Sequence, residues 1–392
     1  MTRDVVIVDG ARTPIGSFLG ALSSLPPTET ATHVAKAALE RSDVAPDRVG
    51  HVVMGHVINT EPRDMYLSRV AAIGAGIPDT TPAMNVNRLC GSGAQAVVSA
   101  LQAVAMGDAD YAMAGGAEAM SRSPHAMQMR TGQKMGDTGM VDMMIGALSC
   151  PFGTGHMGVT AENVAAEHQI SRADQDAFAL ESQKRAGVAM AEGRFAGQIA
   201  PVTVKSRKGD IVVDTDEHPK PATTAEDLAK LRTVFRKDGT VTAGNASGIN
   251  DGAAALILAD AETAAAEGKT ARARVLGYAH AGVRPEVMGL GPIPAVTKLL
   301  ERLSLTTADF DVIESNEAFA AQACAVNRGL GLDTEKVNPN GGAIALGHPI
   351  GATGAILVLK CLAELERTDT KRGLITMCIG GGQGIALAVE RG

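Results

Sequence analysis

Tryptophan is absent from this chain of 392 residues, and aromatic residues of all kinds make up only 3% of it. The chain therefore lacks the aromatic surface on which nucleic-acid-binding proteins stack bases. Acidic residues outnumber basic ones by 43 to 36, which gives a net charge of −7. Because nucleic-acid binding needs a basic face, this composition argues against a nucleic-acid partner. One local cationic cluster, Lys205, Arg207 and Lys208, is expected to be a solvated hairpin tip.

Long apolar runs are scarce as well. We expect no membrane-spanning segment, because we find no apolar run of the roughly 20 residues that such a segment needs. A strand-like run begins at Val5, which leaves no room for a signal peptide. The sequence therefore predicts a cytoplasmic enzyme without membrane attachment.

The five cysteines stand at positions 90, 150, 324, 361 and 378. Their odd number and uneven spacing argue against a disulfide framework. None of them forms a C-x-x-C pair, so the sequence predicts no metal site. This pattern is typical of a reducing compartment, where a thiol can act as a reactive group.

The chain has two halves with the same order of elements, β-α-β-α-β-α-β-β. In the first half, strands are predicted at 5–8, 52–58, 83–86, 111–114 and 253–258, with helices at 28–41, 62–75 and 91–106. In the second half, strands are predicted at 274–279, 311–314, 336–338, 374–378 and 385–389, with helices at 294–303, 318–329 and 351–366. Gly93-Ala94 and Gly354-Ala355 open equivalent helices of the two halves. This alternation implies a mostly parallel sheet covered by helices.

A long insertion interrupts the first half. It contains a polar helix at 172–192 and a β-like pair at 202–213. We predict three parts, which are an N-terminal core half (1–118 plus 251–270), an inserted loop domain (119–250) and a C-terminal core half (271–392). The insertion is expected to cover the active-site face and to form the substrate cradle. An oligomer contact is the competing role for its methionine-rich start.

Cys90 lies between a predicted strand and a helix in the motif NRLCGSG at 87–93. A helix N-terminus places partial positive charge beside the sulfur and should lower the pKa of the thiol. The glycines that follow expose backbone N–H groups to a developing oxyanion. A buried structural cysteine at a tight turn is an equally weighted alternative.

His348, in GHPIG at 347–351, is predicted at the equivalent strand-to-helix junction of the second half. Its imidazole could accept the thiol proton and later donate a hydrogen bond to an oxygen. A lone His-Pro turn is more often structural. Asn316 follows a predicted strand, where its amide could hold a water, donate to an oxyanion or cap the next helix.

A second cysteine, Cys378, precedes three glycines in the motif CIGGG at 378–382. A sulfur beside exposed N–H groups is a candidate base for a carbon acid, and a buried core cysteine is the equal alternative. The other three cysteines lack such glycine neighbours and are expected to pack in core or loop surroundings. We therefore hypothesise an acyltransferase that forms or breaks carbon–carbon bonds.

A competing motif, GSGAQA at 91–96, matches the G-x-G-x-x-A form of a dinucleotide fingerprint. The first strand of a nucleotide-binding unit should precede that motif, whereas here the third strand does. Asp108 and Asp110 also stand before the next strand rather than at its end. These positions argue against a nicotinamide-dependent dehydrogenase.

Together these motifs resemble the four signatures of the thiolases, at 87–93, 316–319, 347–351 and 378–382. The resemblance runs nearly end to end, and the chain is most similar to the biosynthetic acetyl-CoA acetyltransferases. Two stretches, 60–66 and 141–144, are closer to the broad-specificity β-ketothiolases of polyhydroxyalkanoate synthesis. The resemblance implies an α/β fold with a duplicated β-α-β-α-β-α-β-β thiolase-like core. It also implies two stacked mixed sheets in a five-layer arrangement, with an inserted loop domain.

The resemblance also implies a reaction. This is the reversible Claisen condensation of two acetyl-CoA, or of acyl-CoA and acetyl-CoA, to 3-ketoacyl-CoA and CoA. Cys90 would carry the acyl group in a ping-pong path, and His348 would activate the thiol. Cys378 would remove or return the α-proton. His348 and a water held by Asn316 would bind the enolate oxygen, while the N–H groups of Cys90 and Gly380 would form the other oxyanion hole.

No permanently bound cofactor or metal is implied, since coenzyme A and acyl-CoA, including acetoacetyl-CoA and other 3-ketoacyl-CoA, are substrates. The predicted substrate- and CoA-binding residues are Leu148, His156, Met157, Lys220, Phe235, Ala243, Ser247, Met288, Ala318 and Phe319. Lys220 stands where the family often has an arginine, so positive charge is kept but bidentate phosphate contact is lost. The resemblance further implies a homotetramer.

Three alternatives stay open. Thiolytic degradation of longer 3-ketoacyl-CoA could be the main role. A ketoacyl synthase shares the duplicated fold but carries histidine or asparagine where this chain has Cys378. A non-catalytic acyl-CoA-binding homologue would not need the four chemical groups that this chain retains.

Overall fold

The structure, a computed structural model, describes residues 3–207 and 209–392. Its main sheet follows the order β14-β15-β16-β13-β1-β12-β5-β3-β4, and the short β2 (Gly16–Ser17) pairs with β12. The N-terminal strands are β1 (Val5–Arg12), β3 (Val49–Gly55), β4 (Ala83–Val86), β5 (Tyr111–Ala119) and β12 (Asn250–Asp260). The C-terminal strands are β13 (Ala273–Gly282), β14 (Val312–Ser315), β15 (Arg372–Ile379) and β16 (Gln383–Glu390). Within the described ranges, two residue pairs between β1 and β13 join the two sets of strands.

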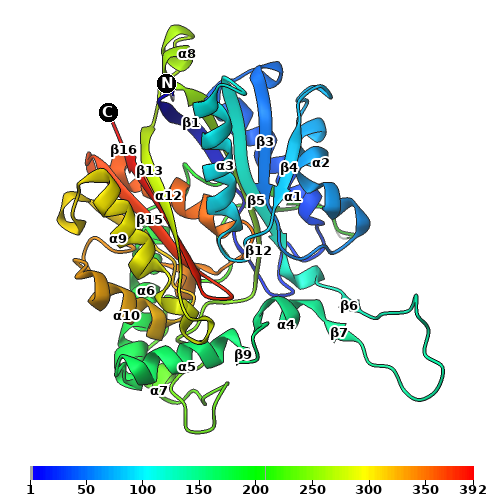
Figure 1. Ribbon diagram of the computed structural model, residues 1–392, viewed down its shortest axis with the longest axis vertical. Helices are drawn as coiled ribbons and strands as arrows, with labels where there is room; N and C mark the ends of the chain where they lie inside the picture. Colours follow the sequence, from blue (N-terminus) through cyan, green and yellow to red (C-terminus); the bar gives the residue numbers. More distant parts are fainter. Residues whose placement is uncertain (1–2, 208) are drawn as a thin grey trace.

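Helices cover both sets of strands and separate them (Figure 1). The N-terminal half contains α1 (Pro27–Ser42), α2 (Leu67–Gly74), α3 (Ser92–Met106) and α8 (Ala261–Ala266). The C-terminal half contains α9 (Pro292–Leu303), α10 (Ala320–Leu330), α11 (Ala343–Leu346) and α12 (Thr353–Thr368). Short 3₁₀ turns lie at Pro46–Arg48, Pro62–Tyr66, Met120–Arg122, Pro285–Leu290 and Thr307–Asp309.

Three hydrophobic cores define five layers. One core lies between α1, α2 and the N-terminal strands, and another lies between α9 and the C-terminal strands. The central core holds α3 and α12 between the two sets of strands. These layers confirm the predicted arrangement of two stacked mixed sheets.

The strand directions correct the expectation of a mostly parallel sheet. β3 runs parallel to β4 and β5, and β14 runs parallel to β15. In contrast, β12 is antiparallel to β1 and β5, and β16 is antiparallel to β13 and β15. Short turns such as the one between β15 and β16 permit only antiparallel return, whereas parallel neighbours need a crossover.

The repeated Gly-Ala pairs mark the point where α3 and α12 touch. A Cβ at Gly354 would lie 2.1 Å from the backbone nitrogen of Ala94, and one at Gly93 would lie 2.9 Å from the nitrogen of Ala355. Only glycine permits this approach of two backbones. The local repeat in the sequence is therefore a packing contact between the halves.

Two element predictions need correction. The predicted strand at 336–338 is only a single bridge between Val337 and Ile313. As a result, the GHPIG loop follows the short helix α11 rather than a strand. The segment Leu89–Met106 is long and apolar enough to cross a membrane by length and composition, contrary to expectation. Most of that segment is buried as α3, so core packing accounts for its apolar character.

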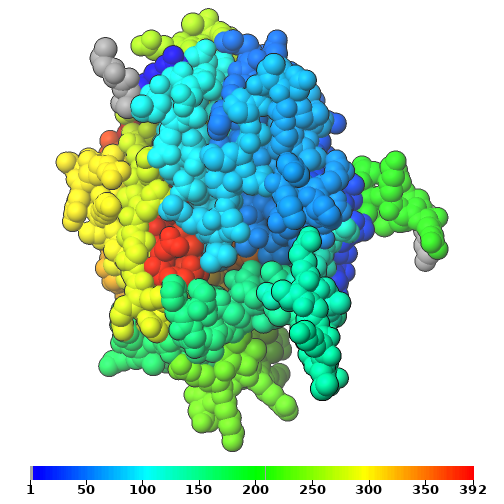
Figure 2. Space-filling view, turned by 45° about the vertical axis from the view of Figure 1, so that its right-hand side comes forward, coloured from blue at the N-terminus to red at the C-terminus, as the bar shows by residue number. Residues whose placement is uncertain are grey.

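The insertion between β5 and β12 lies beside the ends of both sheets (Figure 1). Its helices are α4 (Met143–Ala147), α5 (Met157–Glu167), α6 (Arg172–Ala191) and α7 (Ala225–Ala229). Its strands are β6 (His125–Ala126), β7 (Val141–Asp142), β8 (Ser149–Cys150), β9 (Gly155–His156), β10 (Val202–Val204) and β11 (Ile211–Val213). Of the expected hairpin tip, Lys208 lies outside the described residues. Figure 2 shows the red C-terminal segment surfacing where the blue-to-cyan first half meets the green insertion.

Candidate active site

Cys90 lies in a tight turn between β4 and α3. Leu89, just before it, has a φ of 45°, in the left-handed region that disfavours a leucine. Hydrogen bonds hold this turn, because the Ser92 hydroxyl donates to the Leu89 carbonyl at 2.7 Å and accepts the N–H of Arg88 at 2.9 Å. The turn presents the thiol at the N-terminal end of α3.

The pKa of Cys90 does not move in the expected direction. Burial raises the pKa of the thiol to about 11, although the N–H groups of Gly380 and Cys90 itself lower it in part. The Glu118 carboxylate raises it further. In this site, removal from water outweighs the helix N-terminus, so the resting group is a neutral thiol.

Cys378 lies at the end of β15 and is 1% exposed. Burial raises the pKa of its thiol, and the proximity of Cys90 raises it further. Gly380, two residues later, directs its backbone N–H at the Cys90 sulfur. The turn continues through Gly381 and Gly382, whose φ angles of 84° and 88° favour glycine.

His348 is held as a neutral imidazole with a defined tautomer. Burial lowers the pKa of its ring to about 4. The Thr353 hydroxyl donates to the Pro349 carbonyl at 2.9 Å, so it accepts from Nδ1–H of His348 at 2.7 Å. Nε2 is then the unprotonated nitrogen, and it is the one that can accept a proton.

Asn316 is fully buried beside this imidazole. Its Nδ2 lies 3.4 Å from Nε2 of His348. Its Oδ1 has no hydrogen-bond partner among the described residues. A buried amide with a free acceptor is suited to binding a water molecule.

A cavity of about 780 Å³ unites the candidate groups, and Cys90, His348 and Cys378 all line it. The ten predicted substrate- and CoA-binding residues also line it, namely Leu148, His156, Met157, Lys220, Phe235, Ala243, Ser247, Met288, Ala318 and Phe319. Asn316 contacts His348, which lines the cavity, and the backbone N–H of Gly380 donates to the Cys90 sulfur. The structure therefore brings the candidate residues of all four motifs together.

The insertion builds the wide part of the cavity around stacked rings. The rings of His156 and Phe235 stack with centroids 4.7 Å apart, and Phe319 contacts Phe235 edge-on. A Cβ at Gly158 would lie 2.2 Å from the Phe235 ring, so only glycine fits at this position. Lys220 is an exposed part of the lining.

Sequence reasoning missed two residues that orient His348. Thr353 fixes its tautomer, and Asn250 accepts its backbone N–H at 2.9 Å. Thr353 stands five residues after His348, so the first turn of the helix after the GHPIG motif could have indicated it. Asn250 comes from a distant strand, and only the fold brings it here.

The two thiols and the imidazole around one cavity define a thiol-dependent acyltransferase. Two family models match the chain, described as "Thiolase, N-terminal domain" over residues 5–262 and "Thiolase, C-terminal domain" over residues 269–391. The chain therefore belongs to the thiolase family.

Named relatives and solved structures agree with this assignment. Over the full length of both chains, the protein is 58% identical to "Beta-ketothiolase BktB" of Cupriavidus necator. It is 52% identical, again at full coverage of both chains, to an "Acetyl-CoA acetyltransferase" of Thiocystis violacea. The structure of human mitochondrial 3-ketoacyl-CoA thiolase in complex with CoA matches with a TM-score of 0.97 at 42% identity, covering 100% of this chain and 98% of that one. These findings confirm the predicted family, fold class and acyltransferase activity.

Proposed function

We propose that this thiolase catalyses the reversible reaction of acyl-CoA and acetyl-CoA to 3-ketoacyl-CoA and CoA, through an acyl group on Cys90. One observation carries the proposal: the N–H of Gly380, in the turn after Cys378, reaches the Cys90 sulfur. That contact brings together the two turns that carry Cys90 and Cys378, which come from opposite halves of the chain. His348 lines the same cavity. The acetyl-CoA acetyltransferase and β-ketothiolase names of the relatives support it.

In the thiolytic direction, the Cys90 sulfur attacks the 3-keto carbon and passes its proton to Nε2 of His348. The low pKa of His348 and the high pKa of Cys90 disfavour a preformed ion pair. Proton transfer therefore accompanies attack rather than preceding it. The bond between C2 and C3 then breaks, leaving an acyl group on Cys90 and the enolate of acetyl-CoA.

The enolate carbon takes a proton from the Cys378 thiol. The high pKa of that thiol keeps it protonated until the enolate forms, and it makes the thiolate a strong base in the reverse direction. The thiol of incoming CoA then attacks acyl-Cys90. It gives its proton to the Cys378 thiolate. The Cys90 sulfur leaves the acyl group and takes its proton back from Nε2 of His348, so both sulfurs and the imidazole return to their starting state.

Two sets of hydrogen-bond donors are proposed to stabilise the oxyanions. The N–H groups of Cys90 and Gly380 converge on the Cys90 sulfur, and they would donate to the acyl oxygen beside that sulfur. Protonated His348 and a water on Asn316 would bind the enolate oxygen. Such preorganised donors need no solvent reorganisation during the reaction.

Coenzyme A is proposed to bind along the insertion. The apolar walls from Leu148, Met157, Met288 and Phe319 would hold the pantetheine and acyl chain. Lys220 would meet the phosphates as a single charge rather than a bidentate group. The CoA complex of the human mitochondrial thiolase supports CoA as the ligand of this fold.

Acetoacetyl-CoA is the first substrate to test. With CoA present, the enolate absorbance of acetoacetyl-CoA should fall as two acetyl-CoA form. A kinetic series from acetoacetyl-CoA through 3-ketovaleryl-CoA to longer 3-ketoacyl-CoA then measures the chain-length preference. Loss of malonyl-CoA by decarboxylation, without thiolysis, would instead indicate a ketoacyl synthase.

We also propose a homotetramer that assembles through the β6–β7 arm, residues 125–142, and that works in the cytoplasm. The arm projects from the body of the molecule (Figure 2). Met129, Met135 and Met140 on this arm are 63%, 90% and 59% exposed. Exposed apolar side chains grouped on one projection are typical of an interface.

The proposed cytoplasmic location is a separate point. The five free cysteines are consistent with a reducing compartment.

Replacing Met129 and Met140 together by glutamate should convert tetramers to dimers, because buried charges would oppose assembly. Light scattering coupled to size-exclusion chromatography should show about half the mass. Val212→Glu is the matched control, since Val212 is 60% exposed on a different hairpin, β10–β11. An unchanged mass of the double variant would contradict the role of the arm.

A further inference from the structure

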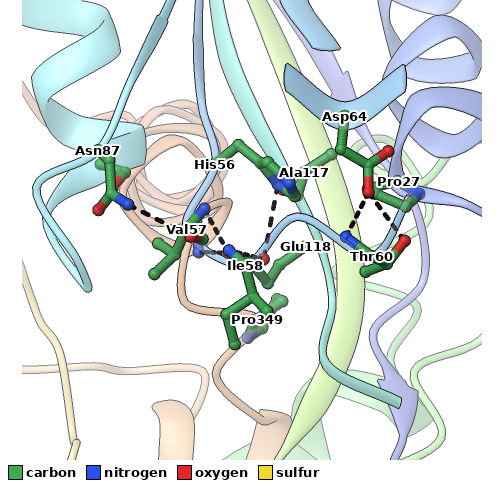
Figure 3. A network of polar contacts seen from close by, with 12 residues as sticks. Pro27, His56, Val57, Ile58, Thr60, Asp64, Asn87, Ala117, Glu118 and Pro349 are labelled. Carbon is green, nitrogen blue, oxygen red and sulfur yellow. Dashed lines mark hydrogen bonds and ion pairs between the residues drawn. The ribbon is translucent and has the colours of Figure 1, made fainter. Parts of the chain in front are cut away.

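Glu118 is a buried carboxylate at the end of β5, and the reaction steps above do not use it. It is 1% exposed. Its Oε2 accepts the backbone N–H of Val57 and its Oε1 accepts that of Ile58, both at 3.1 Å (Figure 3). Oε2 also accepts the backbone N–H of Gly351 at 2.9 Å. One side chain therefore binds two loops, one from each half of the chain.

The first of these loops leads to the nucleophile. The Val57 carbonyl accepts a hydrogen bond from Nδ2 of Asn87 at 3.2 Å (Figure 3). Oδ1 of the same amide accepts the N–H of Leu89 at 3.0 Å. Leu89 holds the disfavoured positive φ directly before Cys90. Glu118 is thus connected to the Cys90 turn through Val57 and Asn87.

The second loop leads to the imidazole. Gly351 stands three residues after His348, and its backbone packs directly on the ends of the first-half strands. A Cβ at Gly351 would lie 2.5 Å from Oε2 of Glu118, and a Cβ at Gly116 would lie 2.1 Å from the Gly351 carbonyl. The loop therefore lies against the carboxylate with no room for a side chain at Gly351, and the hydrogen bond from the Gly351 N–H at 2.9 Å joins the two.

One histidine and three backbone N–H groups act on the charge of the Glu118 carboxylate. Nδ1 of His56 lies 3.5 Å from Oε1 of Glu118 and 2.9 Å from the Ala117 carbonyl, to which it donates. Burial raises the pKa of Glu118, while His56 and the three N–H groups lower it. An ionised carboxylate offers only acceptors, which is what three converging donors require.

We propose that Glu118 is a positioning residue that sets the place of the Cys90 turn relative to the His348 loop. Its two oxygens hold both loops through hydrogen bonds to their backbone N–H groups. A displacement of about 1 Å between reacting groups can lower the rate about 100-fold. This inference rests on the proposed function only for its kinetic readout. The geometry stands on the hydrogen bonds themselves.

The decisive variant is Glu118→Gln, in which the amide nitrogen must face at least one backbone N–H. We expect kcat for thiolysis to fall about 10- to 100-fold. The KM for CoA should change less than about twofold, because the proposed CoA grip lies on the insertion. Glu162→Gln is the matched control, since Glu162 is also buried and accepts the N–H groups of Thr240 and Val241. It should lower thermal stability without lowering kcat.

A second measurement separates the effect of the Glu118 charge from the effect of its side-chain length. The titratable groups that line the cavity with Cys90 are His348, Cys378, His156, His218 and Lys220. Glu118 also acts on the Cys90 thiol. Because Glu118 raises the pKa of Cys90, alkylation of Cys90 by iodoacetamide should shift to lower pH in Glu118→Gln. Glu118→Asp keeps the charge but not the reach, so it should retain the wild-type alkylation profile while kcat falls.

Asn87→Ala tests the chain of contacts without altering a buried carboxylate, because Asn87 is exposed. We expect kcat to fall several-fold as the Cys90 turn loosens. A folded Glu118→Gln enzyme with kcat within twofold of wild type would overturn the proposal. So would an equal fall of kcat in Glu162→Gln. If the unchanged chain does not cleave acetoacetyl-CoA, the proposed function fails, whereas an unchanged kcat in Glu118→Gln beside an active unchanged chain contradicts the positioning proposal alone.

Discussion

Cys90→Ser should lower thiolysis of acetoacetyl-CoA by about 1000-fold or more. The neutral imidazole of His348 must take the nucleophile's proton during attack, and it is already a weak base at a pKa of about 4. An alcohol holds its proton far more tightly than a thiol, so little nucleophilic anion forms in the serine variant. Steady-state loss of the enolate absorbance measures the rate, and mass spectrometry measures acyl-enzyme formation.

Cys324→Ser is the matched control for this substitution. Cys324 is a half-buried thiol on α10, and burial also raises its pKa to about 11. It belongs to the small core formed with Ile170 and Ala321 rather than to the cavity wall. Its replacement should leave turnover close to that of the wild type. Full turnover by Cys90→Ser would remove Cys90 as the nucleophile.

Cys378→Ala should separate acylation from carbon chemistry. We expect mass spectrometry to detect an acetyl group on Cys90, because His348 and the backbone N–H groups remain. Exchange of the α-protons of acetyl-CoA in deuterated water should fall by about 10²- to 10⁴-fold, as for loss of a general base. Proton NMR of the methyl group of acetyl-CoA measures this exchange.

Replacing Cys378 by alanine removes one sulfur atom, so it leaves only a small void. The neighbouring side chains are those of Met157, Met288 and Phe319. A stable, folded variant is therefore expected. Cys324→Ala should retain full exchange and serves as the control for loss of a thiol. If exchange continues undiminished without Cys378, another group must be the base and the proton steps proposed above are wrong.

The sequence was sufficient for the family, for most of the element order and for a set of residues that the structure gathers around one cavity, because these depend on local patterns. Cysteines followed by glycines, and a histidine before proline and glycine, are short motifs whose chemistry can be recognised without coordinates. The Gly-Ala pairs at Gly93 and Gly354 likewise marked the duplicated helices, and the structure shows them in contact. Helix boundaries were close because α1, for example, begins at Pro27 and ends before Asp43, which adopts a left-handed conformation.

The predicted strand at 336–338 was wrong for a tertiary reason. An apolar residue in an extended segment has the local pattern of a strand, but a strand needs a partner along several residues. Val337 forms a single β-bridge, with Ile313 of the edge strand β14. The expectation of a mostly parallel sheet was wrong for the same reason, since the local pattern does not record which neighbour each strand will pair with.

What the sequence determined by itself was the set of reactive groups, the duplicated order of elements and the family to which they belong. The tertiary structure alone decided how those groups behave. Burial raises the pKa of Cys90 where a helix N-terminus predicted a fall, and Thr353 and Asn250 set the ring of His348. The reason is that desolvation and hydrogen-bond geometry depend on residues far apart in the chain, which come together only when both halves and the insertion pack around one cavity.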